Sequence, residues 1–195
     1  ADGGEELVVG GQRLVYLDSA NTSQKPRAVL DAIETYYERS NANVHRGTYL
    51  IAEEATAALE GARAKVAGFV GAGSPRETVF AKNATEALNL VAKAWGRAHL
   101  RAGDPVVITE LEHHANIVPW QLLVREKGAV LRVVPITDSG EVMLEEYARL
   151  LGPRTKLVAF SHASNVLGTV LPAREMINMA HSWGAPVLVD GAQSV

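Results

Sequence analysis

Between residues 78 and 190, short apolar runs rich in β-branched residues alternate with longer segments whose apolar residues recur every three or four positions. This alternation predicts an α/β fold with a mainly parallel (mixed) sheet that is flanked by helices and buried on both faces. The predicted strands lie at residues 78–81, 106–109, 130–135, 157–161 and 187–190. The predicted helices between them lie at residues 85–99, 114–127, 143–151 and 172–183.

The N-terminal part of the chain favours two helices joined by a loop. Residues 14–17 favour a short strand, and Pro26 begins the first helix because its fixed φ suits a first helical turn. Asn, Gly and Thr at residues 41–51 indicate a loop. A second helix is predicted over about residues 52–70, with an inward apolar stripe that includes Phe69.

The composition excludes several classes of function. The net charge of −3 leaves no basic excess for binding nucleic acid or an anionic membrane surface. Neither a membrane-length apolar run nor an export signal is visible, so we expect a cytoplasmic location without membrane contact. Cysteine is absent, so no disulfide, thiolate metal site or cysteine nucleophile lies in this chain, and no metal is expected.

Ligands of parallel sheets bind beyond the carboxyl ends of the strands, so the residues after each predicted strand are candidate site residues. Thr85 lies at a helix start that follows the run at 78–81, where free N–H groups and a hydroxyl suit a phosphate. An ordinary helix cap is the alternative. His113 and His114 follow the strand at 106–109, but adjacent helical residues do not form a chelate. His113 could stack its flat ring on a cofactor or act as an acid–base group; the alternative is an ordinary histidine in a surface loop.

Two more predicted strands also end in polar residues. Asn165, after the strand at 157–161, offers both a donor and an acceptor for a carboxylate or a ring oxygen, unless it only forms a turn before Gly168. Asp190 ends a buried strand, where a carboxylate requires a cation, a metal, strong donors, or a role as a helix cap. Gln193 lies three residues further on, within reach of the same ligand.

Together these groups suit a ligand with a phosphate, a flat ring and a basic ring nitrogen. Pyridoxal 5'-phosphate has these three parts. A dinucleotide is the natural competitor, but no Gly-x-Gly-x-x-Gly motif or Walker loop follows a predicted strand.

Seven segments, in order along the chain, resemble the class V, fold-type I pyridoxal-phosphate enzymes. They are most similar to SufS-type cysteine desulfurases, for which Glu-His-His-Ala-Asn followed by Pro-Trp-Gln is the most specific match. The segments are Tyr16–Ala20, Thr22–Pro26, Val44–Gly47, Lys82–Val91, Glu112–Gln121, Ser161–Gly168 and Val189–Gln193.

The resemblance implies a role for each candidate residue in cofactor binding. Ala84 and Thr85 would hold the cofactor phosphate. His113 would stack on the pyridine ring and act as the catalytic residue of this half, by relaying protons. Asp190 would pair with the protonated ring nitrogen, and Gln193 would donate to the phenolic oxygen.

The resemblance also implies a substrate side of the site. Asn165 would contact the substrate carboxylate or the ring, and His45 and Arg46 would lie on a loop at the active-site mouth, unless that loop is a polar surface turn. Two positions depart from the family pattern. Asn21 stands where the family usually has Ala or Gly, and Tyr49 stands where His is common. These departures affect the expected substrate preference rather than the class.

The fold that the resemblance implies is an incomplete fold-type I large domain. Residues 1–50 would form an N-terminal segment of strand, helix and active-site loop, and residues 51–195 the first part of the pyridoxal-phosphate domain. Because the chain begins at Ala1 and ends at Val195 after an apolar run, we expect an N-terminal fragment of a longer protein. The Schiff-base lysine, persulfide cysteine and carboxylate-binding arginine would lie beyond it, so the chain alone is expected to be inactive.

The implied activity is conversion of L-cysteine to L-alanine and an enzyme-bound persulfide, as a sulfur source for iron–sulfur cluster assembly. The resemblance further implies a homodimer and a SufE- or SufU-like sulfur-acceptor protein. Three alternatives stay open: a selenocysteine lyase, another class V enzyme, and a non-catalytic fragment that only binds a ligand.

Overall fold

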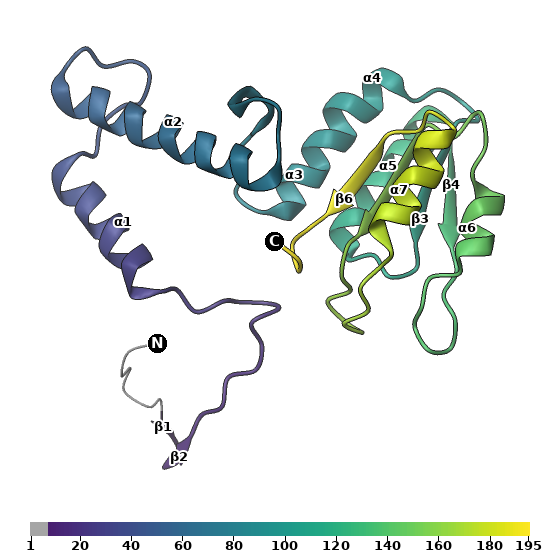
Figure 1. The fold of residues 1–195 in the computed structure, drawn as a ribbon, viewed down its shortest axis with the longest axis horizontal. Coiled ribbons are helices and arrows are strands. Elements are labelled where there is room, and N and C mark those ends of the chain that lie inside the picture. The colour runs from purple at the N-terminus through teal and green to yellow at the C-terminus, as the bar shows by residue number, and fades with distance from the viewer. Residues whose placement is uncertain (1–7) are drawn as a thin grey trace. The chain divides into compact units, whose positions relative to one another are not determined.

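The computed structural model describes residues 8–195, which form two compact units divided between Phe80 and Ala81 (Figure 1). The expected division at residue 50 stays a prediction about the full-length protein. Residues 1–7 of the expected N-terminal segment lie outside the described residues.

The second unit contains a four-stranded sheet in the order β4-β3-β5-β6, and every neighbouring pair is parallel. Four of the five predicted strands are thereby confirmed. The strands are β3 (Pro105–Thr109), β4 (Val130–Val134), β5 (Leu157–Ser161) and β6 (Val187–Asp190). The helical elements are α3 (Ala84–Val91), the π-helical turn η2 (Ala92–Gly96), α4 (Arg97–His99), the 3₁₀ turn η3 (His114–Asn116), α5 (Val118–Lys127), α6 (Leu144–Leu150) and α7 (Ala173–Ser182).

Helices cover both faces of the sheet, because alternate residues of β3 and β5 belong to different hydrophobic clusters. Val107 and Phe160 pack in one cluster with residues of α6 and α7, including Tyr147 and Met176. Val106, Ile108 and Ala159 pack in the other with residues of η2 and α5. The two central strands are buried throughout, as predicted, whereas β4 and β6 at the sheet margins are partly exposed.

The predicted helix at 85–99 is confirmed as α3, η2 and α4 in unbroken succession. Within it, Gly96 is buried, and a Cβ at this position would overlap the Cδ2 atom of Leu123. Leu123 lies on α5 and is itself 4% exposed. The missing side chain therefore lets α5 pack closely against η2.

The first unit contains little sheet. Its elements are β1 (Val8–Val9), β2 (Gln12–Arg13), α1 (Arg27–Arg39), α2 (Leu50–Val70) and the 3₁₀ turn η1 (Pro75–Glu77). Both predicted helices are confirmed, and Gly71 ends α2 in the left-handed conformation with φ of 73°. The strand predicted at 14–17 is wrong, because the only paired strands among the described residues of this unit are β1 and β2.

The strand predicted at 78–81 is also wrong. Arg63 of α2 holds this segment instead, since its Nη1 donates to the Thr78 carbonyl at 2.6 Å and its guanidinium lies 5.0 Å from the Phe80 ring centroid. The predicted inward position of Phe69 is wrong as well, because Phe69 is 77% exposed in this chain. Apolar periodicity therefore predicted the helix correctly but not the exposure of Phe69.

Substitution of two helical glycines by alanine tests the packing of η2. We expect Gly96→Ala to destabilise the protein by about 1–3 kcal/mol, because the methyl group overpacks the core against Leu123. Gly61→Ala is the matched control, since open space surrounds Gly61 in α2. The control should gain about 0.5–1 kcal/mol from helix propensity. Thermal unfolding measures both shifts, and equal shifts of one sign would contradict the packing argument.

Candidate functional site

Three of the predicted site segments follow adjacent strands of the sheet. Strand β5 lies between β3 and β6, and all three are parallel, so their carboxyl ends share one edge. The helix α3 contacts η3, the turn that follows β3. The sheet therefore brings together the segments that carry His113, Asn165 and Asp190, and the contact between α3 and η3 adds the segment that carries Thr85.

The start of α3 is a reciprocal cap that leaves two donors available. The Asn83 side chain accepts from the Glu86 amide at 2.9 Å, and the Glu86 carboxylate accepts from the Lys82 amide at 2.6 Å. The cap that sequence reasoning offered as an alternative is therefore present. It occupies the Glu86 amide but leaves the Ala84 and Thr85 amides without a hydrogen bond among the described residues. Two free amides at a helix start can still hold a phosphate.

The ring of His113 is oriented by the backbone of its own turn. His113 precedes η3, and its Nδ1 accepts from the Ala115 amide at 3.1 Å. The neighbouring His114 ring lies edge-on, 5.9 Å away between centroids. Since Nδ1 is occupied as an acceptor, Nε2 is the ring nitrogen available to a ligand. The side chain is exposed, which suits stacking on a bound ring.

Asp190 ends β6 directly opposite Ser161 of β5. Its Oδ1 accepts from the Ala192 amide at 3.0 Å, and its backbone carbonyl accepts from the His162 amide at 2.9 Å. The side chain is partly exposed, so one carboxylate oxygen is oriented by the turn while the group stays accessible to a ligand. Gln193 is exposed in the turn after it. Asn165 is exposed in the turn that follows β5.

A buried carboxylate beneath these segments was missed by the sequence reasoning. Glu112 is 8% exposed and accepts hydrogen bonds from Thr109, Asn116 and Ser161. Burial raises the pKa of Glu112 above its ordinary value of 4.5, and these hydrogen bonds oppose the rise. The signal in the sequence was a Glu three residues after a strand-end Thr and four before an Asn, the spacing of one helical turn.

His45 and Arg46 belong to the first unit, whereas the residues described above belong to the second. His45 has a φ of 62°, its amide donates to Thr56 Oγ1 at 2.9 Å, and its Nε2 lies 3.3 Å from Glu60 Oε1. The loop is therefore attached to α2 through His45. Arg46 is exposed on it. Their predicted place at the active-site mouth stays a prediction.

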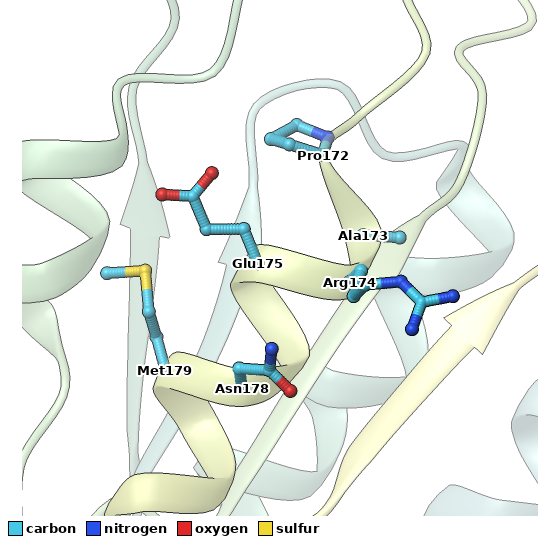
Figure 2. Close-up of a pocket in the computed structure, with 6 residues that line it drawn as sticks. All are labelled: Pro172, Ala173, Arg174, Glu175, Asn178 and Met179. Atoms are coloured by element: carbon cyan, nitrogen blue, oxygen red, sulfur yellow. The ribbon is translucent and has the colours of Figure 1, made fainter.

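Two hollows of the surface are lined by other residues. One, of about 460 Å³, lies along α7 and is lined by Pro172, Ala173, Arg174, Glu175, Asn178 and Met179 (Figure 2). The other, of about 390 Å³, lies near the amino ends of β5 and β6, opposite the edge that carries the candidate residues. The candidate residues lie instead at the carboxyl ends of three strands and at the start of α3. Among the described residues no group of acidic, histidine or cysteine side chains is arranged to hold a metal.

Comparison with known proteins gives one family for nearly the whole chain. Residues 15–195 match the model of the aminotransferase class-V family. The chain belongs to this family. A cysteine desulfurase of Synechococcus elongatus is 54% identical over 96% of the chain, and one of Dickeya dadantii is 53% identical over 96%. These matches confirm the resemblance to cysteine desulfurases.

Solved structures support the same assignment of fold. The apo cysteine desulfurase of Thermococcus onnurineus is 39% identical over 92% of this chain, with a TM-score of 0.88. The cysteine desulfurase CsdA of Escherichia coli is 38% identical over 91%, with a TM-score of 0.81. The chain spans 30% and 45% of the two sequence relatives and 44% and 45% of these two structures. It therefore corresponds to less than half of each.

Pyridoxal phosphate is the cofactor of this family, and the related C-DES enzyme has been solved with it. The two structural neighbours confirm the expected fold-type I α/β architecture.

Within residues 8–195, no helix combines the length and the apolar character that crossing a membrane requires.

The pKa shift of Glu112 predicts how stability depends on pH. A raised pKa means that the folded protein binds this proton more tightly than the unfolded chain. The contribution of Glu112 to the free energy of unfolding should therefore fall as the pH rises from about 4.5 through the pKa of folded Glu112. Glu112→Gln should lack this decline. Urea unfolding at several pH values measures the difference, with Glu110→Gln as the control for an exposed carboxylate. If the stability of wild type relative to Glu112→Gln rose with pH, the raised pKa would be contradicted.

Proposed function

We propose that the full-length protein containing this chain is a pyridoxal-phosphate-dependent cysteine desulfurase. It converts L-cysteine and an enzyme thiol into L-alanine and an enzyme persulfide, so that the sulfur leaves the substrate carbon and bonds to the acceptor sulfur. The observation that carries the proposal is the common edge at which β3, β5 and β6 place His113, Asn165 and Asp190. The choice of L-cysteine as substrate is supported by the two sequence relatives, which are named cysteine desulfurases.

The residues present fit the cofactor. The free amides of Ala84 and Thr85 would bind the phosphate, and the exposed ring of His113 would cover one face of the pyridine. Asp190 would hold the proton on the ring nitrogen, because a carboxylate oriented by the Ala192 amide favours a protonated partner. When bound, pyridoxal phosphate supplies an electron sink for the substrate amino acid.

His113 would also move a proton near the substrate. Its Nδ1 accepts from the Ala115 amide, so proton exchange with a ligand would take place at Nε2. Asn165 would orient the substrate carboxylate or the ring through its amide, and Gln193 would donate to the phenolic oxygen. His45 and Arg46 would contact the substrate at the site mouth. The 195 residues hold no cysteine, so the thiol that receives sulfur would come from elsewhere in the full-length protein.

We further propose that the protein acts as a cytoplasmic homodimer of the SufS type that supplies iron–sulfur cluster assembly. A SufE- or SufU-like protein would receive the persulfide sulfur. The Glu-His-His-Ala-Asn and Pro-Trp-Gln sequences at residues 112–121 support this branch.

Replacement of Asp190 tests the activity. In the full-length protein with cofactor, Asp190→Asn should keep the hydrogen bond from Ala192 but remove the charge, and lower kcat by about 100-fold or more. Alanine release from L-cysteine measures the effect. Asp104→Asn is the control, because Asp104 also accepts from a backbone amide, that of Arg101, but lies before β3 at the opposite end. Near-normal turnover by Asp190→Asn would contradict its role, and release from L-selenocysteine alone would contradict the substrate.

Proline at the start of α3 tests phosphate binding. Ala84→Pro removes one free amide, and the extended Asn83 before it tolerates a following proline. The dissociation constant for pyridoxal phosphate, followed by fluorescence titration, should rise by about 10-fold or more. Leu50→Pro makes the same change at the first residue of α2, after the extended Tyr49, and should leave it unchanged. Equal affinity in both variants would show that the α3 amides do not bind the phosphate.

A further inference from the structure

Glu112 lies where the carboxyl ends of the two central strands meet. Its Oε1 accepts from the Thr109 hydroxyl at 2.5 Å, and its Oε2 accepts from the Asn116 amide at 2.6 Å and the Ser161 hydroxyl at 2.9 Å. Thr109 ends β3, Ser161 ends β5, and Asn116 belongs to η3. One carboxylate therefore joins three elements.

The three side chains that hydrogen-bond this carboxylate all donate to it: the hydroxyls of Thr109 and Ser161 and the side-chain amide of Asn116. A carboxylate accepts all three, whereas a glutamine has one acceptor oxygen, and its N–H group would require a hydroxyl to turn round and accept. The surroundings therefore favour a carboxylate over an amide of the same size.

The network continues into the hydrophobic core. Asn116 accepts from the indole N–H of Trp120 at 2.8 Å, and both side chains are fully buried. Trp120 belongs to the cluster that packs under the sheet with Ile108. The position of Asn116, and of the carboxylate bound to it, is thus held by the core.

His113 is the residue between Glu112 and η3. Its own ring is held by the Ala115 amide, inside the turn that the Glu112–Asn116 hydrogen bond closes. The backbone N–H of Asn116 donates to the His113 carbonyl at 2.8 Å, which is a second hydrogen bond that closes the same turn. The orientation of the His113 ring therefore depends on where Glu112 holds the turn.

We propose that Glu112 is a positioning residue, which fixes the plane of the His113 ring by tying η3 to the ends of β3 and β5. This inference rests on the proposed function for what the ring does, but not for how it is held. Glu112 itself is buried and acts through His113.

The test in the full-length protein compares Glu112→Gln with Glu110→Gln. Glu110 is the matched control because it is exposed and, within residues 8–195, its side chain accepts only from the Ile136 amide. Glu112→Gln should lower kcat by about 10-fold or more and leave KM within about twofold, because misplacement of a catalytic ring affects the chemical step. The visible circular dichroism of the bound cofactor should weaken, since its asymmetry reports the ring stacked on it. Unchanged kcat and dichroism would overturn the proposal.

A double-mutant cycle separates positioning from a general structural effect. If Glu112 acts through His113, adding Glu112→Gln to His113→Ala should lower kcat no further. Additive losses would overturn the proposal. Should Glu112→Gln fail to fold, Ser161→Ala removes a single donor and should show the same non-additivity with a smaller effect.

Hydrogen exchange of the cofactor-free protein keeps this inference independent of the proposed activity. Glu112→Gln should speed exchange of the Ala115, Asn116 and Ile117 amides by about 10-fold or more, while α7 keeps its protection. Unchanged exchange in the turn, or an equal loss in α7, would overturn the proposal. If the wild-type protein neither binds pyridoxal phosphate nor turns over L-cysteine, the proposed function fails while this measurement still decides how the turn is held.

Discussion

Strands β3 and β5 are buried along their whole length, so their backbone groups need partners within the protein, and the adjacent parallel strands supply most of them. Because the strands are parallel, their connections must cross over the sheet, and the helices that do so cover both faces. The alternation of Val106 with Val107, one toward each hydrophobic cluster, follows from this arrangement. The rest of the second unit is organised around this buried pair.

The same constraint creates the candidate site. Parallel strands end at one edge, where the chain leaves the sheet and polar groups become accessible. His113, Asn165 and Asp190 follow strands that are neighbours in space but distant in sequence. A carboxylate would normally be costly so near the core, yet Glu112 is stabilised by donors from both buried strand ends. The hydrogen bonds of Glu112 therefore connect the polar edge, through Asn116 and Trp120, to the apolar core of the sheet.

The first unit is organised differently. Its helices and loop are attached by side chains, such as the hydrogen bond from Arg63 to Thr78 and the close approach of His45 to Glu60. Gly47 permits the loop to lie on α2, since a Cβ there would overlap that of Ala52. Such contacts depend on individual side chains and leave little periodic pattern in the sequence, so an apolar run such as 78–81 predicted a strand where Arg63 holds an irregular segment instead.

The sequence by itself determined the α/β class, four of the strands, the helices between them and the family, because strand and helix periods and strand-end motifs are local properties of the chain. It also indicated which side chains follow each strand. Only the tertiary structure decided that β5 lies between β3 and β6, that Phe69 is exposed in this chain, and that Glu112 joins two strand ends. These features depend on contacts between residues far apart in sequence, such as Glu112 with Ser161, and local propensity carries no information about such pairs.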